Sequence, residues 1–281
     1  MGITLVQKSD LTKPKKNVKI ALVLAGGAIS GGAFKLGGLV ALNRFLKSKK
    51  VTDFDIHVGL SAGAFLDAFI ASGISPEELL RGLDGKSLRV SQFRPIDFYY
   101  PNFDEFGAKF YKLFRDLVTL YPSIFFKIAR YLPSHSKELI ALLEDFVNTP
   151  SYANFERLLL PVARYMMESS SLPHPARYIP SGLFDNLSIE RYMRTNLERN
   201  RLPNNFKVLF RERGIALYIC ATNLNTARGV VFGHDSDHTL TISEAVQAST
   251  AIPAFYKPAR IRGEDYVDGG VRKTANVSLA P

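Results

Sequence analysis

A serine between two glycines is the strongest candidate for chemistry in this sequence of 281 residues. It lies in the pentapeptide Gly59-Leu60-Ser61-Ala62-Gly63. A Gly-x-Ser-x-Gly pattern is typical of a sharp turn between a strand and a helix, where the hydroxyl is exposed and only glycine fits on either side. Such a serine can attack a carbonyl carbon when a base accepts its proton. Because the pattern is short, an ordinary strand-to-helix turn is the alternative interpretation.

The residues around the pentapeptide favour the catalytic interpretation. Residues 54–58 form a short apolar run that is typical of a buried strand, and a helical pattern follows as far as Ser72. Gly73 is a typical stop at the C-terminus of a helix. The amino end of this helix would place partial positive charge near an oxyanion that forms at Ser61.

Histidines are poor candidates for the base that Ser61 needs. In α/β-hydrolases an acid and then a histidine follow the serine toward the C-terminus. Here one histidine lies in the predicted strand, two lie in a middle segment of different pattern, and two flank the polar loop 235–237. We interpret them as surface or packing residues, with the pair beside the polar loop as the alternative base. The histidines are His57, His135, His174, His234 and His238.

Two further glycine motifs occur, one on each side of the pentapeptide in the chain. The first is Ala25-Gly26-Gly27-Ala28-Ile29-Ser30-Gly31-Gly32, directly after the apolar run 18–25, and the second is Asp268-Gly269-Gly270. Glycine turns at the amino end of a helix can also bind nucleotide phosphates. However, Gly-Lys-Ser/Thr is absent and the glycine spacing differs from the dinucleotide fingerprint. A nucleotide site would also leave the pentapeptide unexplained.

These three motifs, in this order, resemble the patatin-like phospholipase family. That family has a glycine-rich oxyanion loop after its first strand, a Gly-x-Ser-x-Gly elbow and a late Asp-Gly-Gly or Asp-Gly-Ala. The segments 245–253 and 218–225 also look like the family's second half. The resemblance covers residues 18–85 and 180–275 and leaves the middle of the chain unmatched.

The resemblance implies a lipid acyl hydrolase that uses a Ser-Asp dyad. Ser61 would be the nucleophile and Asp268 its base, and the backbone N–H groups of Gly26, Gly27 and Ala28 would form the oxyanion hole. Gly59 and Gly63 would belong to the elbow, and Gly269 and Gly270 to the aspartate motif. An ordinary aspartate is a weaker base than histidine by roughly 3.4 kcal/mol, so the oxyanion must be strongly stabilised. The mechanism requires neither a metal nor an organic cofactor.

The implied fold is α/β, a three-layer α/β/α sandwich of patatin type with a mainly parallel central sheet and a helical cap insertion. We expect a solvated tail over residues 1–17, a catalytic domain over 18–281 and the insertion over 86–180. The insertion carries an aromatic stripe at helical spacing that includes Phe106, Phe110 and Phe114. Pro122 is predicted to start a new helix. The sequence ends at Ala280-Pro281, soon after Asp268, where the family domain continues into another strand, so we expect a C-terminal truncation.

The first glycine motif departs from the family pattern of Gly-x-Gly-x-Arg-Gly or its lysine equivalent. Ala28 occupies the middle glycine position, and Ser30 or Gly31 the basic position. An alanine fits there if its φ is negative, and whether Lys35 replaces the missing charge is left open. These departures motivate the alternative that the chain is a catalytically impaired lipid-binding protein of the same fold.

The formal net charge of +10 favours an acidic partner, either nucleic acid or an anionic membrane surface. No nucleic-acid-binding module is recognisable, so we expect a lipid ester substrate and peripheral contact with a membrane. Basic residues beside the aromatic stripe would face anionic headgroups, namely Lys109, Lys112, Arg115, Lys127 and Arg130. Because no signal peptide or membrane-spanning run is visible, we expect a cytoplasmic protein.

Overall fold

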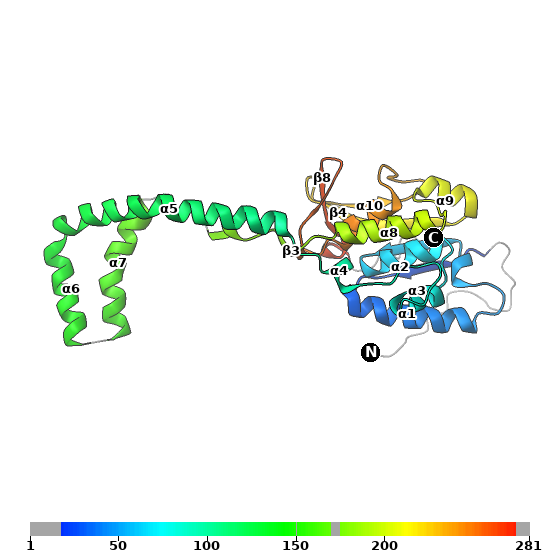
Figure 1. The fold of residues 1–281 in the computed structure, drawn as a ribbon, viewed down its shortest axis with the longest axis horizontal. Helices are drawn as coiled ribbons and strands as arrows, with labels where there is room; N and C mark the ends of the chain where they lie inside the picture. Colours follow the sequence, from blue (N-terminus) through cyan, green and yellow to red (C-terminus); the bar gives the residue numbers. More distant parts are fainter. Residues whose placement is uncertain (1–17, 150, 170–174, 274–281) are drawn as a thin grey trace. The chain divides into compact units, whose positions relative to one another are not determined.

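The computed structural model describes residues 18–149, 151–169 and 175–273. The chain divides into two compact units, here called the sheet unit and the helical unit. The sheet unit comprises Met1–Pro101 and Ser181–Pro281, and the helical unit comprises Asn102–Pro180. Figure 1 shows the helices and strands of both. The predicted tail over residues 1–17 lies outside the described residues, as do residues 274–281.

A six-stranded mixed sheet forms the centre of the sheet unit. Its first three strands are parallel and lie in the order β1-β2-β4, and the remaining three pair antiparallel with β4 or with each other. Two short strands, β3 and β6, pair separately in parallel. The strand bounds are β1 Ala21–Leu24, β2 Ile56–Leu60, β3 Gly182–Phe184, β4 Ala216–Asn223, β5 Arg228–Phe232, β6 Ala254–Tyr256, β7 Ala259–Ile261 and β8 Glu264–Asp268.

Strand β4 brings the ends of β2 and β8 together. Leu60, the last residue of β2, pairs with Cys220 of β4. Asp268, the last residue of β8, pairs with the next residue of β4, Ala221. Because β2 runs parallel to β4 and β8 runs antiparallel to it, the carboxyl ends of β2 and β8 meet. The residue after Leu60 is Ser61, so the sheet places both candidate catalytic residues at one point.

Helices pack against this sheet and against each other. Helices α2 and α10 lie against β2, β4 and β8, and α8 packs on α10 (Figure 1). Helix α4 packs on α8, so residues 86–101, which we assigned to the insertion, belong to the sheet unit. The helix bounds are α1 Ala28–Phe45, α2 Ala62–Ala71, α3 Pro76–Leu83, α4 Pro95–Phe98, α8 Leu187–Arg199, α9 Phe206–Arg213 and α10 Ile242–Thr250, with short 3-10 turns at Val51–Asp53 and Gly269–Val271.

The main core lies between the helices and one face of the sheet. Its fully buried members include Phe69 of α2, Met193 of α8 and Ile219 of β4. A smaller cluster on the other face consists of the strand residues Ile56, Val58, Leu60, Ala216 and Cys220. Since side chains alternate between the faces of a strand, this pattern explains why β2 and β4 read as almost continuous apolar runs.

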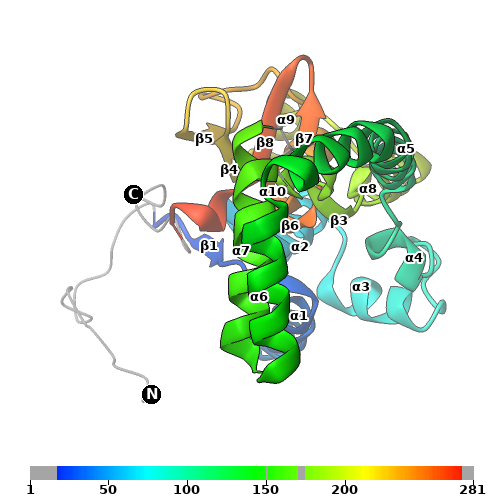
Figure 2. The same ribbon diagram turned by 90° about the vertical axis from the view of Figure 1, so that its left-hand side faces the viewer.

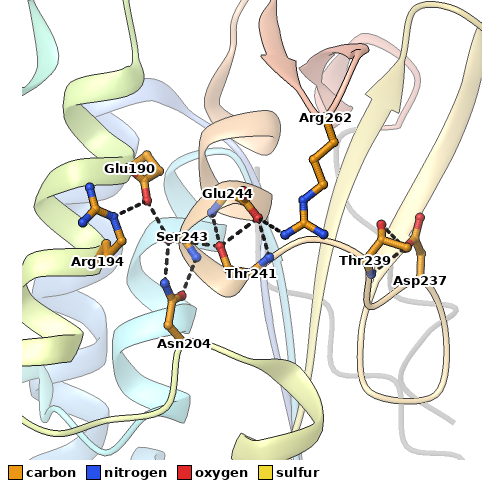
Figure 3. Close-up of polar contacts among 9 residues, drawn as sticks. All are labelled: Glu190, Arg194, Asn204, Asp237, Thr239, Thr241, Ser243, Glu244 and Arg262. Carbon is orange, nitrogen blue, oxygen red and sulfur yellow. Dashed lines mark hydrogen bonds and ion pairs between the residues drawn. The ribbon is translucent and has the colours of Figure 1, made fainter.

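A polar network fixes the start of α10 (Figure 3). Thr241 caps the helix, and its hydroxyl accepts a hydrogen bond from the Glu244 N–H. In return, the Glu244 carboxylate accepts a hydrogen bond from the Thr241 N–H. The Ser243 hydroxyl donates to Glu190 Oε1 at 2.9 Å and accepts from Asn204 Nδ2 at 2.8 Å. These contacts tie α10 to α8 and to the loop before α9.

The helical unit contains the long helix α5 (Phe103–Ser134), followed by α6 (Ser136–Asn148) and α7 (Tyr152–Ser169). A 3-10 turn, η2, spans Pro175–Tyr178. Helices α6 and α7 run side by side, as Figure 2 shows. Within the unit, the Tyr178 hydroxyl donates to Asp116 Oδ2 at 3.0 Å and connects η2 to α5.

The prediction that Pro122 starts a new helix is wrong, because α5 continues through it. A proline inside a helix removes one backbone hydrogen bond and costs about 3 kcal/mol, which a helix of 32 residues can tolerate. Pro161 similarly lies inside α7. In residues 18–149, 151–169 and 175–273 we find no helix that combines the length and the hydropathy of a membrane-spanning segment.

Candidate active site

Ser61 lies on a strained turn between β2 and α2. Its φ of 55° and ψ of −126° fall in a region that residues other than glycine rarely adopt. Gly59 and Gly63 permit this turn, since a Cβ at Gly63 would lie 2.2 Å from the Leu24 oxygen and one at Gly59 would lie 2.5 Å from Ala64 Cα. The two glycines of the pentapeptide are therefore required by close backbone contacts.

Asp268 lies beside Ser61 at the end of β8. Its side chain accepts a hydrogen bond from the Gly270 N–H at 2.7 Å, and the Ser61 side chain lies near enough to lower its pKa. Burial raises the pKa of Asp268, and the Ser61 side chain and the Gly270 N–H lower it only in part, so the net pKa lies above its usual value. Gly269 lets the chain turn against β4, because a Cβ there would lie 2.8 Å from the Cys220 oxygen.

The described histidines have other partners. His57 is fully buried, and its Nδ1 lies 2.9 Å from Asp67 Oδ1. The ring of His234 stacks on Phe210, and that of His135 stacks on Tyr131. His238 Nδ1 lies 2.9 Å from the backbone oxygen of Ser236. His174 lies outside the described residues.

The first glycine motif lies directly against the nucleophile. A Cβ built on Gly26 would be 3.4 Å from Ser61 Cβ and 3.9 Å from Ser61 Oγ. Gly27 has a φ of 146°, and α1 begins at Ala28, inside the glycine motif. The condition under which an alanine fits here, a negative φ, is not met, because the φ of Ala28 is 49°. Ala28 therefore carries backbone strain of about 1–2 kcal/mol that a glycine would avoid.

Lys35 reaches back to this motif from the second turn of α1. Its Nζ donates to the Gly26 oxygen at 2.8 Å and to the Gly31 oxygen at 3.2 Å. In a planar trans peptide the carbonyl and the next N–H point in opposite directions. The Gly27 N–H thus points away from Lys35. Burial lowers the pKa of Lys35 below its usual value.

A cavity of about 730 Å³ opens beside Ser61 within the sheet unit. Its walls come from the start of α1, from α2, from the segment 93–99 and from the chain around β6. Almost all of the lining is aliphatic or aromatic, including Phe65, Phe93, Phe98, Ile252 and Phe255. The size and apolar character suit a small organic ligand with a hydrocarbon portion.

Ser249, in the last turn of α10, is a contact of the nucleophile that the motifs did not single out. Its hydroxyl accepts a hydrogen bond from the Ser61 N–H at 2.8 Å and donates to the Cys220 oxygen at 2.6 Å. Ser249 is fully buried. The only signal in the sequence is its position in the segment 245–253, which looks like the family's second half.

Residues 22–281 match the sequence model of the patatin-like phospholipases. The chain belongs to this family. The match covers nearly the whole chain, including the middle segment in which we found no resemblance. The predicted α/β fold of patatin type is thereby confirmed, and the family supports a lipid substrate and hydrolase chemistry.

Individual relatives of this patatin-like chain are distant. A probable lipid hydrolase, 463L, of Invertebrate iridescent virus 6 is 24% identical over 101 residues, which is 35% of each protein. The crystal structure of VipD from Legionella pneumophila has 18% identity and a TM-score of 0.41, covering 90% of this chain and 46% of VipD. ExoU of Pseudomonas aeruginosa, solved with SpcU, has 18% identity and a TM-score of 0.34, covering 84% and 38%. This chain thus spans less than half of each of the three.

Proposed function

We propose that this chain hydrolyses acyl esters of lipids, with Ser61 as nucleophile and Asp268 as its general base. The observation that carries the proposal is the meeting of Ser61 and the buried Asp268 at consecutive residues of β4, where the Ser61 side chain lowers the pKa of the Asp268 carboxyl. A nucleophile and a base within hydrogen-bonding reach form the minimal arrangement for acyl transfer. Membership of the patatin-like family supports the same chemistry.

In the proposed mechanism Asp268 accepts the hydroxyl proton while Ser61 Oγ attacks the ester carbonyl carbon. The tetrahedral intermediate then collapses, and the proton passes from Asp268 to the departing alcohol. Water, deprotonated by the same carboxylate, attacks the acyl-enzyme and releases the fatty acid and free Ser61. The raised pKa of Asp268 makes it a stronger base than an exposed aspartate and so supports this role.

The backbone N–H groups of Gly26, Gly27 and Ala28 would stabilise the oxyanion. The close approach of Gly26 to Ser61 and the start of α1 at Ala28 support this assignment, because free amides and partial positive charge gather at the amino end of a helix. By fixing the Gly26 carbonyl, Lys35 would orient the Gly27 N–H. The apolar cavity beside Ser61 would hold the acyl chain.

The helical unit would bring the enzyme to an anionic membrane surface. Helix α5 exposes aromatic side chains at helical spacing, with Phe110 71% and Phe114 60% exposed. Lys112 and Arg115 lie on the other side of the same turns, and an amphipathic helix of this composition suits the interface of a bilayer. The side chain of Lys127, which we expected to join them, lies outside the described part.

The test is hydrolysis of chromogenic acyl esters and of a mixed lipid extract, with products identified by mass spectrometry. We expect Ser61→Ala and Asp268→Asn each to lower kcat by about 10³-fold or more. Both variants should retain the wild-type circular dichroism spectrum. Equal ester release by wild type and Ser61→Ala would refute the proposal that Ser61 is the nucleophile of an esterase.

The alternative is a lipid-binding protein of the same fold without catalysis. The positive φ of Ala28 motivates it, because strain in the glycine loop could displace an oxyanion donor. This alternative predicts lipid binding with no ester release by the wild type, and no reaction of Ser61 with an organophosphorus probe.

A further inference from the structure

The end of α10 contacts the backbone of both members of the proposed dyad. The Ser249 hydroxyl accepts the Ser61 N–H at 2.8 Å, and the Ala251 oxygen accepts the Asp268 N–H at 2.9 Å. The same hydroxyl donates to the Cys220 oxygen on β4 at 2.6 Å. One short stretch of chain therefore holds Ser61, Asp268 and the strand between them.

The hydroxyl of Ser249 meets a need that the elbow creates. Ser61 follows the last residue of β2 and has a φ of 55°, so its N–H leaves the ladder of the sheet. Ser61 is only 4% exposed, and a buried N–H without an acceptor would cost about 1–3 kcal/mol. Ser249 supplies that acceptor, and its own proton is directed to Cys220.

We propose that Ser249 is a positioning residue for the reaction. It holds the backbone of Ser61 so that the Ser61 hydroxyl faces the Asp268 carboxylate. This inference rests on the proposed function of the dyad. Ser249 acts through the backbone of Ser61 and takes no part in proton transfer. Its loss should therefore slow the chemical step and leave binding of the acyl chain in the cavity unchanged.

The same helix offers a matched control. Ser243 lies six residues earlier in α10, is also fully buried, and also uses its hydroxyl as donor and acceptor. Its partners are Glu190, Asn204 and Thr241 and not residues of the dyad, as Figure 3 shows. Ser243→Ala should destabilise α10 about as much as Ser249→Ala does.

The experiment compares kcat, KM, Tm and the pH profile of wild type, Ser249→Ala and Ser243→Ala on one soluble ester. For Ser249→Ala we expect kcat to fall on the order of 10- to 100-fold, with KM within about twofold of wild type. For Ser243→Ala we expect a lower Tm and a kcat within about twofold of wild type. Rates are normalised to the fraction of Ser61 that an organophosphorus probe labels.

The pH profile gives a readout that a loss of stability would not change. The Ser61 side chain lowers the pKa of Asp268. If removal of the Ser249 hydroxyl displaces Ser61, the effect of Ser61 on Asp268 weakens, the pKa of Asp268 rises further, and the acid limb of kcat moves to higher pH. Ser243→Ala should leave the limb in place.

An unchanged kcat in Ser249→Ala, or an equal fall in both alanine variants, would overturn the inference. If Ser249→Ala does not fold, Ser249→Cys tests the same point, because it keeps the volume but has a weak acceptor. Its kcat should fall below that of wild type, and wild-type kcat in this folded variant would also overturn the inference. A wild type that neither hydrolyses esters nor reacts with the probe would instead refute the proposed function.

Discussion

Burial makes the Asp268 carboxylate a stronger base and also lowers the stability of the fold when the carboxylate is ionised. Burial raises its pKa, while the Ser61 hydroxyl and the Gly270 N–H lower it only in part. The folded protein therefore binds this proton more tightly than the unfolded chain does. The ionised carboxylate costs stability above the folded-state pKa, and the cost disappears as the pH falls through that pKa.

Asp268→Asn is accordingly expected to raise Tm at neutral pH while it abolishes ester hydrolysis. The gain should shrink as the pH is lowered through the folded-state pKa of Asp268, because wild type then carries the neutral acid. Thermal melts of both proteins over a series of pH values test this. A Tm for Asp268→Asn at or below that of wild type at neutral pH would contradict the role of burial.

At the residue scale, sequence reasoning finds what is encoded locally. Ser61 and Asp268 could be predicted because each lies in a short motif whose glycines are needed for close backbone contacts. Ser249 could not, because 188 residues separate it from Ser61 and only the fold brings them together. The positive φ of Ala28 also could not be predicted from the sequence, because alanine normally adopts a negative φ.

At the scale of elements, Gly63 stabilises the junction of β2 and α2 more than the helix propensity of the residues in α2 does. We expect Gly63→Ala to destabilise the fold by more than about 3 kcal/mol, since the new Cβ would lie 2.2 Å from the Leu24 oxygen. Gly38 in α1 is the control, because nothing lies within 4 Å of a Cβ there. Gly38→Ala should raise the free energy of unfolding by about 0.5–1 kcal/mol.

Denaturant unfolding of both variants measures these changes. Equal stability of Gly63→Ala and wild type would mean that the elbow has another geometry.

The elements of the sheet unit could be predicted closely, because short apolar runs between glycine turns indicate strands of a buried sheet. The helical unit was harder to predict. Proline is a good marker of helix ends in general, but Pro122 and Pro161 lie inside helices. The antiparallel pairing of β8 with β4 also could not be predicted, because it depends on contacts between distant segments.

At the scale of the whole molecule, the helical unit enters and leaves the sheet unit at neighbouring points. Pro101 and Phe184 form an isolated bridge, and the Asp185 N–H donates to the Tyr100 oxygen at 2.8 Å. A variant in which a short Gly-Ser linker replaces residues 102–180 should therefore fold and still hydrolyse a short, soluble ester. Circular dichroism, Tm and ester release test this, and an unfolded product would show that the sheet unit depends on the insertion.

The membrane proposal predicts that two substitutions on α5 weaken binding to anionic vesicles. Phe110→Ser and Phe114→Ser should each lower the partition coefficient on the order of tenfold, because each removes an exposed aromatic ring that would insert into the bilayer interface. Phe45→Ser is the matched control, since Phe45 is 84% exposed but lies on α1 of the sheet unit. Vesicle sedimentation at low salt measures the effect, and equal binding of all variants would exclude α5 as the contact.

The pairing of Leu60 and Asp268 with consecutive residues of β4 makes the dyad independent of how much chain lies between its members. Loops and whole helices can be lengthened there without separating the hydroxyl from the carboxylate. A single residue deleted inside β8 has the opposite effect, because it would turn every following side chain to the other face of the sheet. Such a register shift in the strand would move the Asp268 carboxylate away from Ser61.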